Sequence, residues 1–194
     1  MSTQQTVIAF AGHERIAAGD IARVTAHVTR AMKRAPQRAP ILVFDAVTGD
    51  QVDLDLRAKE QIPPRHHSVG HDAPAGEEPR GPGRPKLGVI AREVTLLPRH
   101  WNWLVSQPGG ASVALRKLVE HAMRANAGKD RVRAAQNAAY RFMSVMAGNR
   151  PGFEEASRAL FAGDAEKFRR LADAWPKDIR DLAVKLAADA LPDL

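Results

Sequence analysis

The residues whose side chains most clearly indicate a binding function are three cations in a short stretch that is rich in proline and glycine. Arg80, Arg84 and Lys86 belong to the sequence Arg-Gly-Pro-Gly-Arg-Pro-Lys. Guanidinium and ammonium groups bind phosphates through charge-assisted hydrogen bonds. Proline keeps such an arm extended, and glycine lets its backbone come close to a ligand. The arm therefore indicates contact with nucleic acid, and these three residues are candidate DNA-binding residues.

No other group of side chains points to catalysis or to a metal. His66, His67 and His71 lie among prolines and glycines, where a metal would lack a third fixed ligand. The aspartates of residues 50–55 fit a turn and the solvent side of a strand. The sequence has no nucleophile elbow, phosphate-cradling glycine loop, metalloprotease helix or dinucleotide fingerprint. We therefore expect no catalytic residue, no metal, no cofactor and no enzymatic activity.

The composition favours an anionic partner. The net charge is +7, and residues 61–130 contain 10 Lys and Arg against 6 Asp and Glu, which is over half of the excess. The chain has no cysteine, so disulfides and thiolate metal sites are excluded. No apolar run approaches the roughly 20 residues that span a bilayer, and the N-terminus lacks the pattern of a signal peptide. We expect a cytoplasmic, nucleoid-associated protein without a membrane partner.

Residues 1–60 predict a small α/β domain. The apolar run 6–11 predicts a strand, and Asp20 is a plausible N-cap of the helix that follows it. Two strand-like runs within 41–56 flank a turn at Gly49, which predicts a β-hairpin. The apolar positions of the helix recur at spacings of three and four residues: Ile21, Val24, Val28 and Met32.

The middle of the chain predicts a linker and then a strand, a turn and two helices. Residues 61–86 form a basic, proline-rich and glycine-rich stretch that is typical of a flexible linker. A strand is expected over 87–97, and a short helix over 98–106 begins with proline. A second helix is expected over 112–126, with Gly128 closing it.

The last part of the chain, residues 129–194, predicts a set of helices. One helix is expected over 134–146 and another over 153–161. Asp164 is a plausible cap of a third helix, and a fourth closes the chain over 179–191. Together these expectations give an α+β fold: a small N-terminal α/β hairpin unit, a middle unit over 87–128 and a C-terminal helical segment.

The middle unit needs a second copy of the chain. A lone strand over 87–97 would leave its backbone donors and acceptors unpaired, and an identical strand would satisfy them. The resulting two-stranded ribbon, backed by four helices, resembles the ribbon-helix-helix DNA-binding proteins, with the match lying in 92–122. The resemblance implies a homodimer whose ribbon enters the major groove of double-stranded DNA. The expected dimer core is apolar: Val94, Leu96, Trp101, Leu104, Leu115 and Leu118.

The same resemblance implies contacts at two places. The backbone of Gly110, Ala111 and Ser112 would hold a phosphate at the start of the second helix. The outward face of the ribbon depends on the register of the strand. Counting back from Pro98 places Arg92, Val94 and Leu96 outward, and a shift by one residue places Ala91, Glu93 and Thr95 outward. Arg92 and Thr95 are the candidate contacts from these two registers.

Two further resemblances complete the interpretation. The arm resembles an AT-hook, although Pro-Gly-Arg-Pro replaces Arg-Gly-Arg-Pro, and this implies that Arg84 enters the minor groove of A·T-rich DNA. The chain as a whole resembles a bacterial family known as domain of unknown function 2239. That likeness lies in the stretches 44–56, 83–116, 140–151 and 153–155. The family implies no activity.

We therefore expect a DNA-binding dimer that acts as a transcriptional regulator or nucleoid-associated protein. The alternative is a non-enzymatic interaction or dimerisation module without specific DNA binding, and the apolar outward positions of the strand favour it. No residue pattern identifies a small-molecule ligand.

Overall fold

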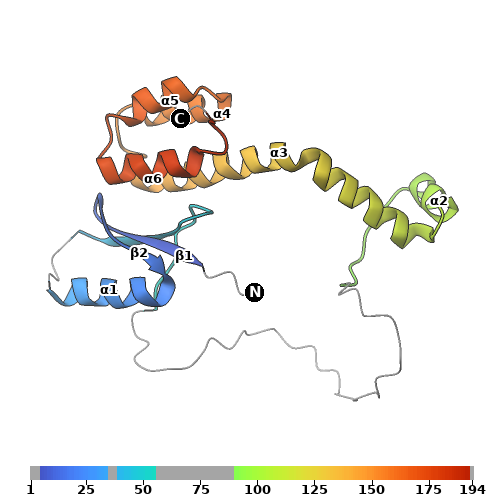
Figure 1. Ribbon diagram of the computed structural model, residues 1–194, viewed down its shortest axis with the longest axis horizontal. Coiled ribbons are helices and arrows are strands. Elements are labelled where there is room, and N and C mark those ends of the chain that lie inside the picture. Colours follow the sequence, from blue (N-terminus) through green and yellow to red (C-terminus); the bar gives the residue numbers. More distant parts are fainter. Residues whose placement is uncertain (1–4, 35–38, 56–89, 193–194) are drawn as a thin grey trace, which may run out of the picture. The chain divides into compact units, whose positions relative to one another are not determined.

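The computed structural model describes residues 5–34, 39–55 and 90–192 of the chain (Figure 1). These residues form two compact units. Unit 1 combines the described residues of 5–55 with those of 123–192, and unit 2 consists of 90–122. The long helix α3 (Gly110–Met146) contributes its first turns to unit 2 and the remainder to unit 1. The predicted α+β fold class is confirmed.

The three strands of unit 1 form one antiparallel sheet in the order β2-β1-β3. Strand β1 (Thr6–Ala11) has the predicted bounds and lies between β2 (Glu14–Asp20) and β3 (Ile41–Asp45). Strand β2 was not predicted from the sequence, because all of its side chains are exposed or half-buried at the sheet edge and show no clear alternation. Strand β3 pairs with β1, whereas the expected second hairpin strand makes only an isolated bridge at Gln51.

Helix α1 (Ile21–Arg34) covers one face of the sheet. Its Val24 and Val28 are buried in a cluster with three strand residues, Val7, Ala9 and Val43. The expected N-cap is confirmed, since the backbone N–H of Arg23 donates to Asp20 Oδ1 at 2.9 Å. Ile21 and Met32, which were expected on the buried face, are 42% and 46% exposed, so the buried stripe of α1 is narrower than predicted.

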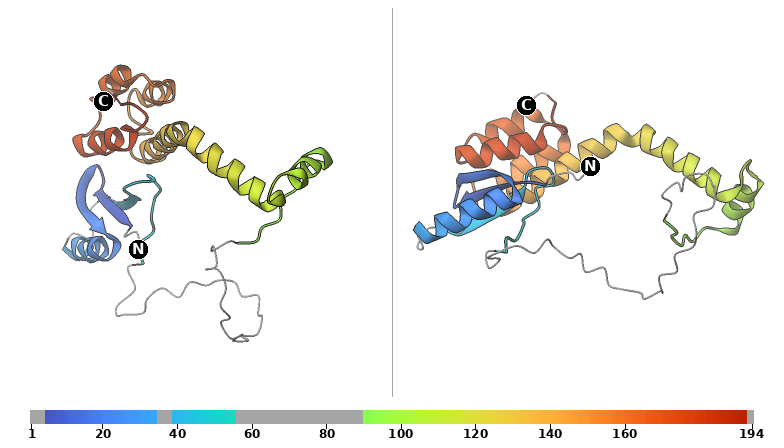
Figure 2. Two further views of the ribbon diagram at one scale, coloured as in Figure 1. Left: turned by 45° about the vertical axis from the view of Figure 1, so that its right-hand side comes forward. Right: turned by 60° about the horizontal axis from the view of Figure 1, so that its bottom comes forward.

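The second half of α3 and the last helix, α6 (Lys177–Ala187), cover the opposite face of the sheet. Two further helices, α4 (Phe153–Ala162) and α5 (Ala165–Ala172), lie on the far side of these two (Figure 2). Asp164 caps α5 as predicted, because its side chain accepts from the backbone N–H of Lys167 at 3.0 Å. No helix among the described residues is both long and apolar enough to cross a membrane.

Three phenylalanines join this second layer to the sheet. Phe10 of β1, Phe44 of β3 and Phe142 of α3 are all fully buried. The ring centroid of Phe142 lies 5.6 Å from that of Phe10 and 5.0 Å from that of Phe44. Edge and tilted arrangements of this kind are favourable beyond the burial of apolar area. Because Phe142 comes almost one hundred residues after Phe44, the core of unit 1 forms only when both ends of the chain meet.

A backbone contact at Gly49 fixes how closely the sheet approaches α3. Gly49 has a φ of 68°, a left-handed conformation that favours glycine. A Cβ atom on this residue would lie 2.1 Å from the carbonyl oxygen of Ala138 in α3. Only glycine therefore lets the turn after β3 lie directly against the helix backbone.

The stretch 87–128, which was predicted as one middle unit, differs from the prediction in two respects. Helix α2 (Pro98–Ser106) has the expected bounds and begins with proline, but residues 90–97 form no strand in the single chain. The strand was expected to pair with a second copy, and a single chain supplies no such partner. The prediction that Gly128 ends a helix is also wrong, because α3 continues through it. A helical glycine costs about 1 kcal/mol, which the packing of α3 in unit 1 offsets.

We predict that Gly49→Ala destabilises unit 1 by about 3 kcal/mol, because the new methyl group adds a clash to an unfavourable backbone conformation. Gly163→Ala is the matched control. Gly163 has a φ of 76°, and a Cβ atom there meets nothing within 4 Å, so only the conformational cost of about 1 kcal/mol applies. Urea unfolding of the two variants measures the difference. Equal losses of unfolding free energy would contradict the close contact.

Candidate functional site

Unit 2 exposes an unusual amount of apolar surface for its size. Among its described residues only Leu104 and Ala114 are buried. Large apolar side chains that stand at least 38% exposed occur in residues 90–97, in α2 and in the first turns of α3: Ile90, Val94, Leu97, Trp101, Trp103, Val105, Leu118 and Val119. A folded monomer rarely leaves so many large apolar side chains in contact with water.

The residues expected in the dimer core do not form a core within one chain. Val94, Trp101 and Leu118 are exposed, with 53%, 38% and 48% of their surface in solvent. Leu96 and Leu115 are half-buried. Leu104 alone of the six is buried, at 3% exposure. A second copy of the chain is not part of the structure, so the dimer core stays a prediction.

The expected DNA contacts fall into three groups. The arm residues Arg80, Arg84 and Lys86 lie outside the described residues. Arg92 and Thr95 are exposed on the segment 90–97. The residues expected to hold a phosphate lie at the first turn of α3, where two are half-buried and one is exposed: Gly110, Ala111 and Ser112. At least one side chain in each described group is therefore accessible to a ligand.

The backbone of the segment before α2 is free to pair. Within the described parts of the chain, no backbone group of residues 90–96 takes part in a backbone hydrogen bond. The first bonds appear at the start of α2, where the carbonyl oxygen of Leu97 accepts from the N–H groups of His100 and Trp101. A row of unpaired donors and acceptors in an extended segment is the property that lets a further strand add to it.

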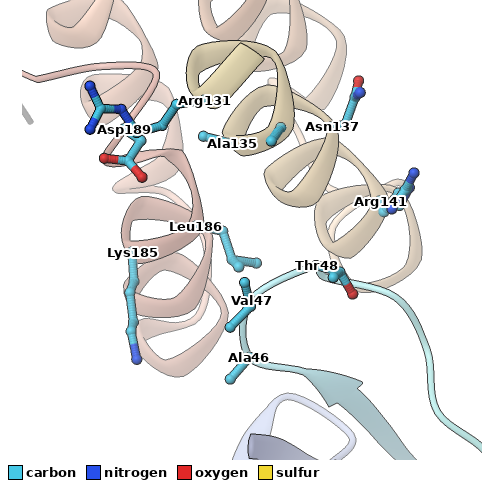
Figure 3. Close-up of a pocket in the computed structure, with 11 residues that line it drawn as sticks. Ala46, Val47, Thr48, Arg131, Ala135, Asn137, Arg141, Lys185, Leu186 and Asp189 are labelled. Carbon is cyan, nitrogen blue, oxygen red and sulfur yellow. The ribbon is translucent and has the colours of Figure 1, made fainter. Parts of the chain in front are cut away.

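Unit 1 contains a pocket that the sequence analysis did not find. A cavity of about 500 Å³ lies between α3, α6 and the turn after β3 (Figure 3). Its apolar side includes Val47, Ala135 and Leu186, and its charged side includes Arg131 and Asp189. These residues are spread over more than 130 positions of the sequence, so no local motif could have revealed them. No group of three or more His, Asp or Glu residues in the described chain could hold a metal.

Asp45 holds the turn that forms one wall of this pocket. Its Oδ1 accepts from the backbone N–H groups of Val47 and Thr48, each at 2.8 Å, and its Oδ2 accepts from Gln5 Nε2 at 2.9 Å. Burial alone would raise the pKa of Asp45, but the hydrogen bonds from Thr48, Val47 and Gln5 outweigh it and lower the pKa below its usual value. The carboxylate is thus the form that the fold prefers.

Comparison with known proteins places the chain in one family. A family model described as "uncharacterized protein conserved in bacteria (DUF2239)" matches residues 6–187, which include nearly all of both units. The chain belongs to the DUF2239 family. No curated protein and no solved structure matches it. Family membership confirms the resemblance seen in the sequence and adds no activity, so the function of this DUF2239 protein must be argued from its own residues.

We predict that Asp45→Asn lowers the unfolding free energy by about 1–2 kcal/mol at pH 7, because hydrogen bonds to a charged acceptor are stronger than those to an amide. A group whose pKa is lowered in the folded state contributes stability above its ordinary value of 3.8. That contribution disappears as the pH falls through the lowered folded value. Urea unfolding at pH 7 and at pH 3 measures the difference between the variant and the unaltered protein.

The exposed Asp53 provides a control, since Asp53→Asn removes a charge without removing a turn. We expect Asp53→Asn to have little effect at either pH. If the loss of unfolding free energy in Asp45→Asn stayed constant down to low pH, the charge of Asp45 would not be what stabilises the turn.

Proposed function

We propose that unit 2 pairs with unit 2 of a second copy of the chain, and that the resulting homodimer binds double-stranded DNA. The observation that carries the proposal is the apolar surface of unit 2, which has only two buried side chains among its described residues. Residues with so small a core do not form a stable unit without a partner, a metal or a disulfide. The chain has no cysteine, which leaves a partner as the simplest source of burial.

A second copy fits this surface better than an unrelated partner. The segment 90–96 belongs to no helix or strand and is mostly exposed, and its free backbone groups are available to an identical antiparallel segment. Pairing two such segments also brings the exposed Trp101 and Leu118 of each copy toward the same two-fold axis. One interface thus covers both the polar backbone and the apolar side chains.

The charges of unit 2 favour DNA as the ligand of this dimer. Arg92, Arg99, Arg116 and Lys117 are exposed or half-buried cations, against the two carboxylates Glu93 and Glu120. The arm with Arg84 precedes this unit directly in the sequence. Cations on a dimer contact the regular array of phosphates on a duplex, and a paired ribbon fits the major groove. On this basis we propose that the protein is a transcriptional regulator or a nucleoid-associated protein and has no enzymatic role.

A second function is favoured by the side chains of the segment 90–97. Val94 and Leu96 are apolar and Glu93 is acidic, so neither strand register presents a row of base-reading groups. These residues suit a unit that only dimerises or binds another protein. The two functions share the dimer and differ in whether the dimer binds DNA.

We predict that Val119→Glu dissociates the dimer, because it places a charge in the proposed apolar interface. Val145→Glu is the matched control, since both residues are exposed valines on α3, at 55% and 48%, and Val145 lies in unit 1. Light scattering should give about twice the chain mass of 21.1 kDa for the unaltered protein and for Val145→Glu, and the single-chain mass for Val119→Glu. A monomeric unaltered protein would contradict the proposal.

We predict that the dimer binds A·T-rich duplex more tightly than G·C-rich duplex, with an affinity that falls steeply with salt. Arg84→Gln with Lys86→Gln should weaken binding and make the slope of log K against log salt shallower by about two, because two phosphates are no longer neutralised. Arg169→Gln with Arg170→Gln on α5 removes the same charge and is the control. Fluorescence anisotropy across a salt series measures these slopes.

Equal effects of the two double variants would show that net charge rather than the arm drives binding. A stable dimer that binds A·T-rich and G·C-rich duplexes weakly and equally would exclude specific DNA recognition. The dimerisation module would then remain as the function.

A further inference from the structure

The pocket of unit 1 has an apolar side that is open to a ligand. Val47 lies at the turn after β3 and is 76% exposed, although it is a large apolar residue. Figure 3 shows Val47 and Leu186 directed into the space between the turn and α6, with Ala135 of α3 facing the same space. Small side chains on α3 keep the space open, and its volume of about 500 Å³ lies in the range of small-molecule sites.

Two opposite charges lie at one end of the same pocket. Figure 3 shows the side chain of Arg131 reaching from α3 toward Asp189, which follows the end of α6. None of the ion pairs found among the described residues involves either side chain. The other two cations of the lining are placed differently: Arg141 pairs with Asp50 at 3.0 Å, and Lys185 extends away from this end.

We propose that this pocket binds an α-amino acid with a large apolar side chain. The ligand carboxylate contacts the guanidinium of Arg131, and its ammonium group contacts the carboxylate of Asp189. The apolar side chain of the ligand packs against Val47, Ala135 and Leu186 and removes them from water. This site goes beyond the proposed DNA binding and does not depend on it.

The pairing of charges selects this class of ligand over simpler ones. A ligand with only a negative charge would be attracted by Arg131 but repelled by Asp189. A ligand with only a positive charge would be attracted by Asp189 but repelled by Arg131. An α-amino acid carries an ammonium group and a carboxylate on the same carbon atom, which matches two side chains of opposite charge at one end of a pocket. A polar amino acid would leave the apolar side of the pocket in contact with water.

The test measures direct binding of three probes to the full chain by calorimetry: L-phenylalanine, 3-phenylpropanoate, which lacks the ammonium group, and 2-phenylethylamine, which lacks the carboxylate. We expect phenylalanine to bind about tenfold more tightly than either single-charge probe, since each probe loses one charge-assisted hydrogen bond. Glycine, which has both charges and no side chain, should bind more weakly than phenylalanine.

Two variants test which charged group of the ligand each of the two residues binds. Arg131→Gln should weaken the binding of phenylalanine and 3-phenylpropanoate by about tenfold. It should tighten the binding of 2-phenylethylamine, because this cation no longer meets a like charge. Asp189→Asn should weaken the binding of phenylalanine and 2-phenylethylamine and tighten that of 3-phenylpropanoate, which no longer meets a like charge. Both residues are exposed, so both variants should fold. Arg158→Gln on α4 removes an exposed arginine that does not line the pocket, and it should leave all three affinities unchanged.

This crossed pattern would support the site. The inference is overturned if phenylalanine does not bind, if glycine binds as tightly as phenylalanine, or if the two variants weaken all three probes alike. None of these outcomes depends on whether the protein dimerises or binds DNA.

Discussion

The backbone of Gly49 lies against the carbonyl group of Ala138, and no side chain fits between the two. This contact sets the distance between the sheet and α3, so it also sets the space available to Phe10, Phe44 and Phe142. The carboxylate of Asp45 holds the same turn in place through two backbone N–H groups. Since the turn forms one wall of the pocket, the shape of that pocket depends on the same contact.

Local signals in the sequence were sufficient wherever a single residue determines an element. Asp20 and Asp164 cap helices at the expected places, and Pro98 begins α2 where proline is favoured. The apolar run over 6–11 predicted strand β1 with the bounds that the structure shows. In each case the chemistry that fixes the element lies within a few residues of it, which is why it could be found without a structure.

Tertiary contacts decided the rest. Strand β2 depends on β1 and not on its own apolar pattern. Strand β3 pairs with β1 along its whole length and with the run that follows it at a single bridge. Helix α3 continues past Gly128 because its second half is anchored by buried residues such as Ala139 and Phe142. The pocket is lined by residues from three distant parts of the chain, and their spacing in the sequence does not show that they lie close together in space.

The assembly of unit 1 from both ends of the chain has a consequence for its biosynthesis. The backbone N–H of Arg15 donates to Asp178, so strand β2 gains this contact only when the last helix has been made. During translation the first 55 residues leave the ribosome with Phe10 and Phe44 still uncovered, and α3 emerges roughly ten seconds later. Unit 2 is synthesised within that interval. A nascent chain therefore exposes two apolar surfaces in succession, and it is most vulnerable to aggregation and to chaperone capture before its C-terminal helices appear.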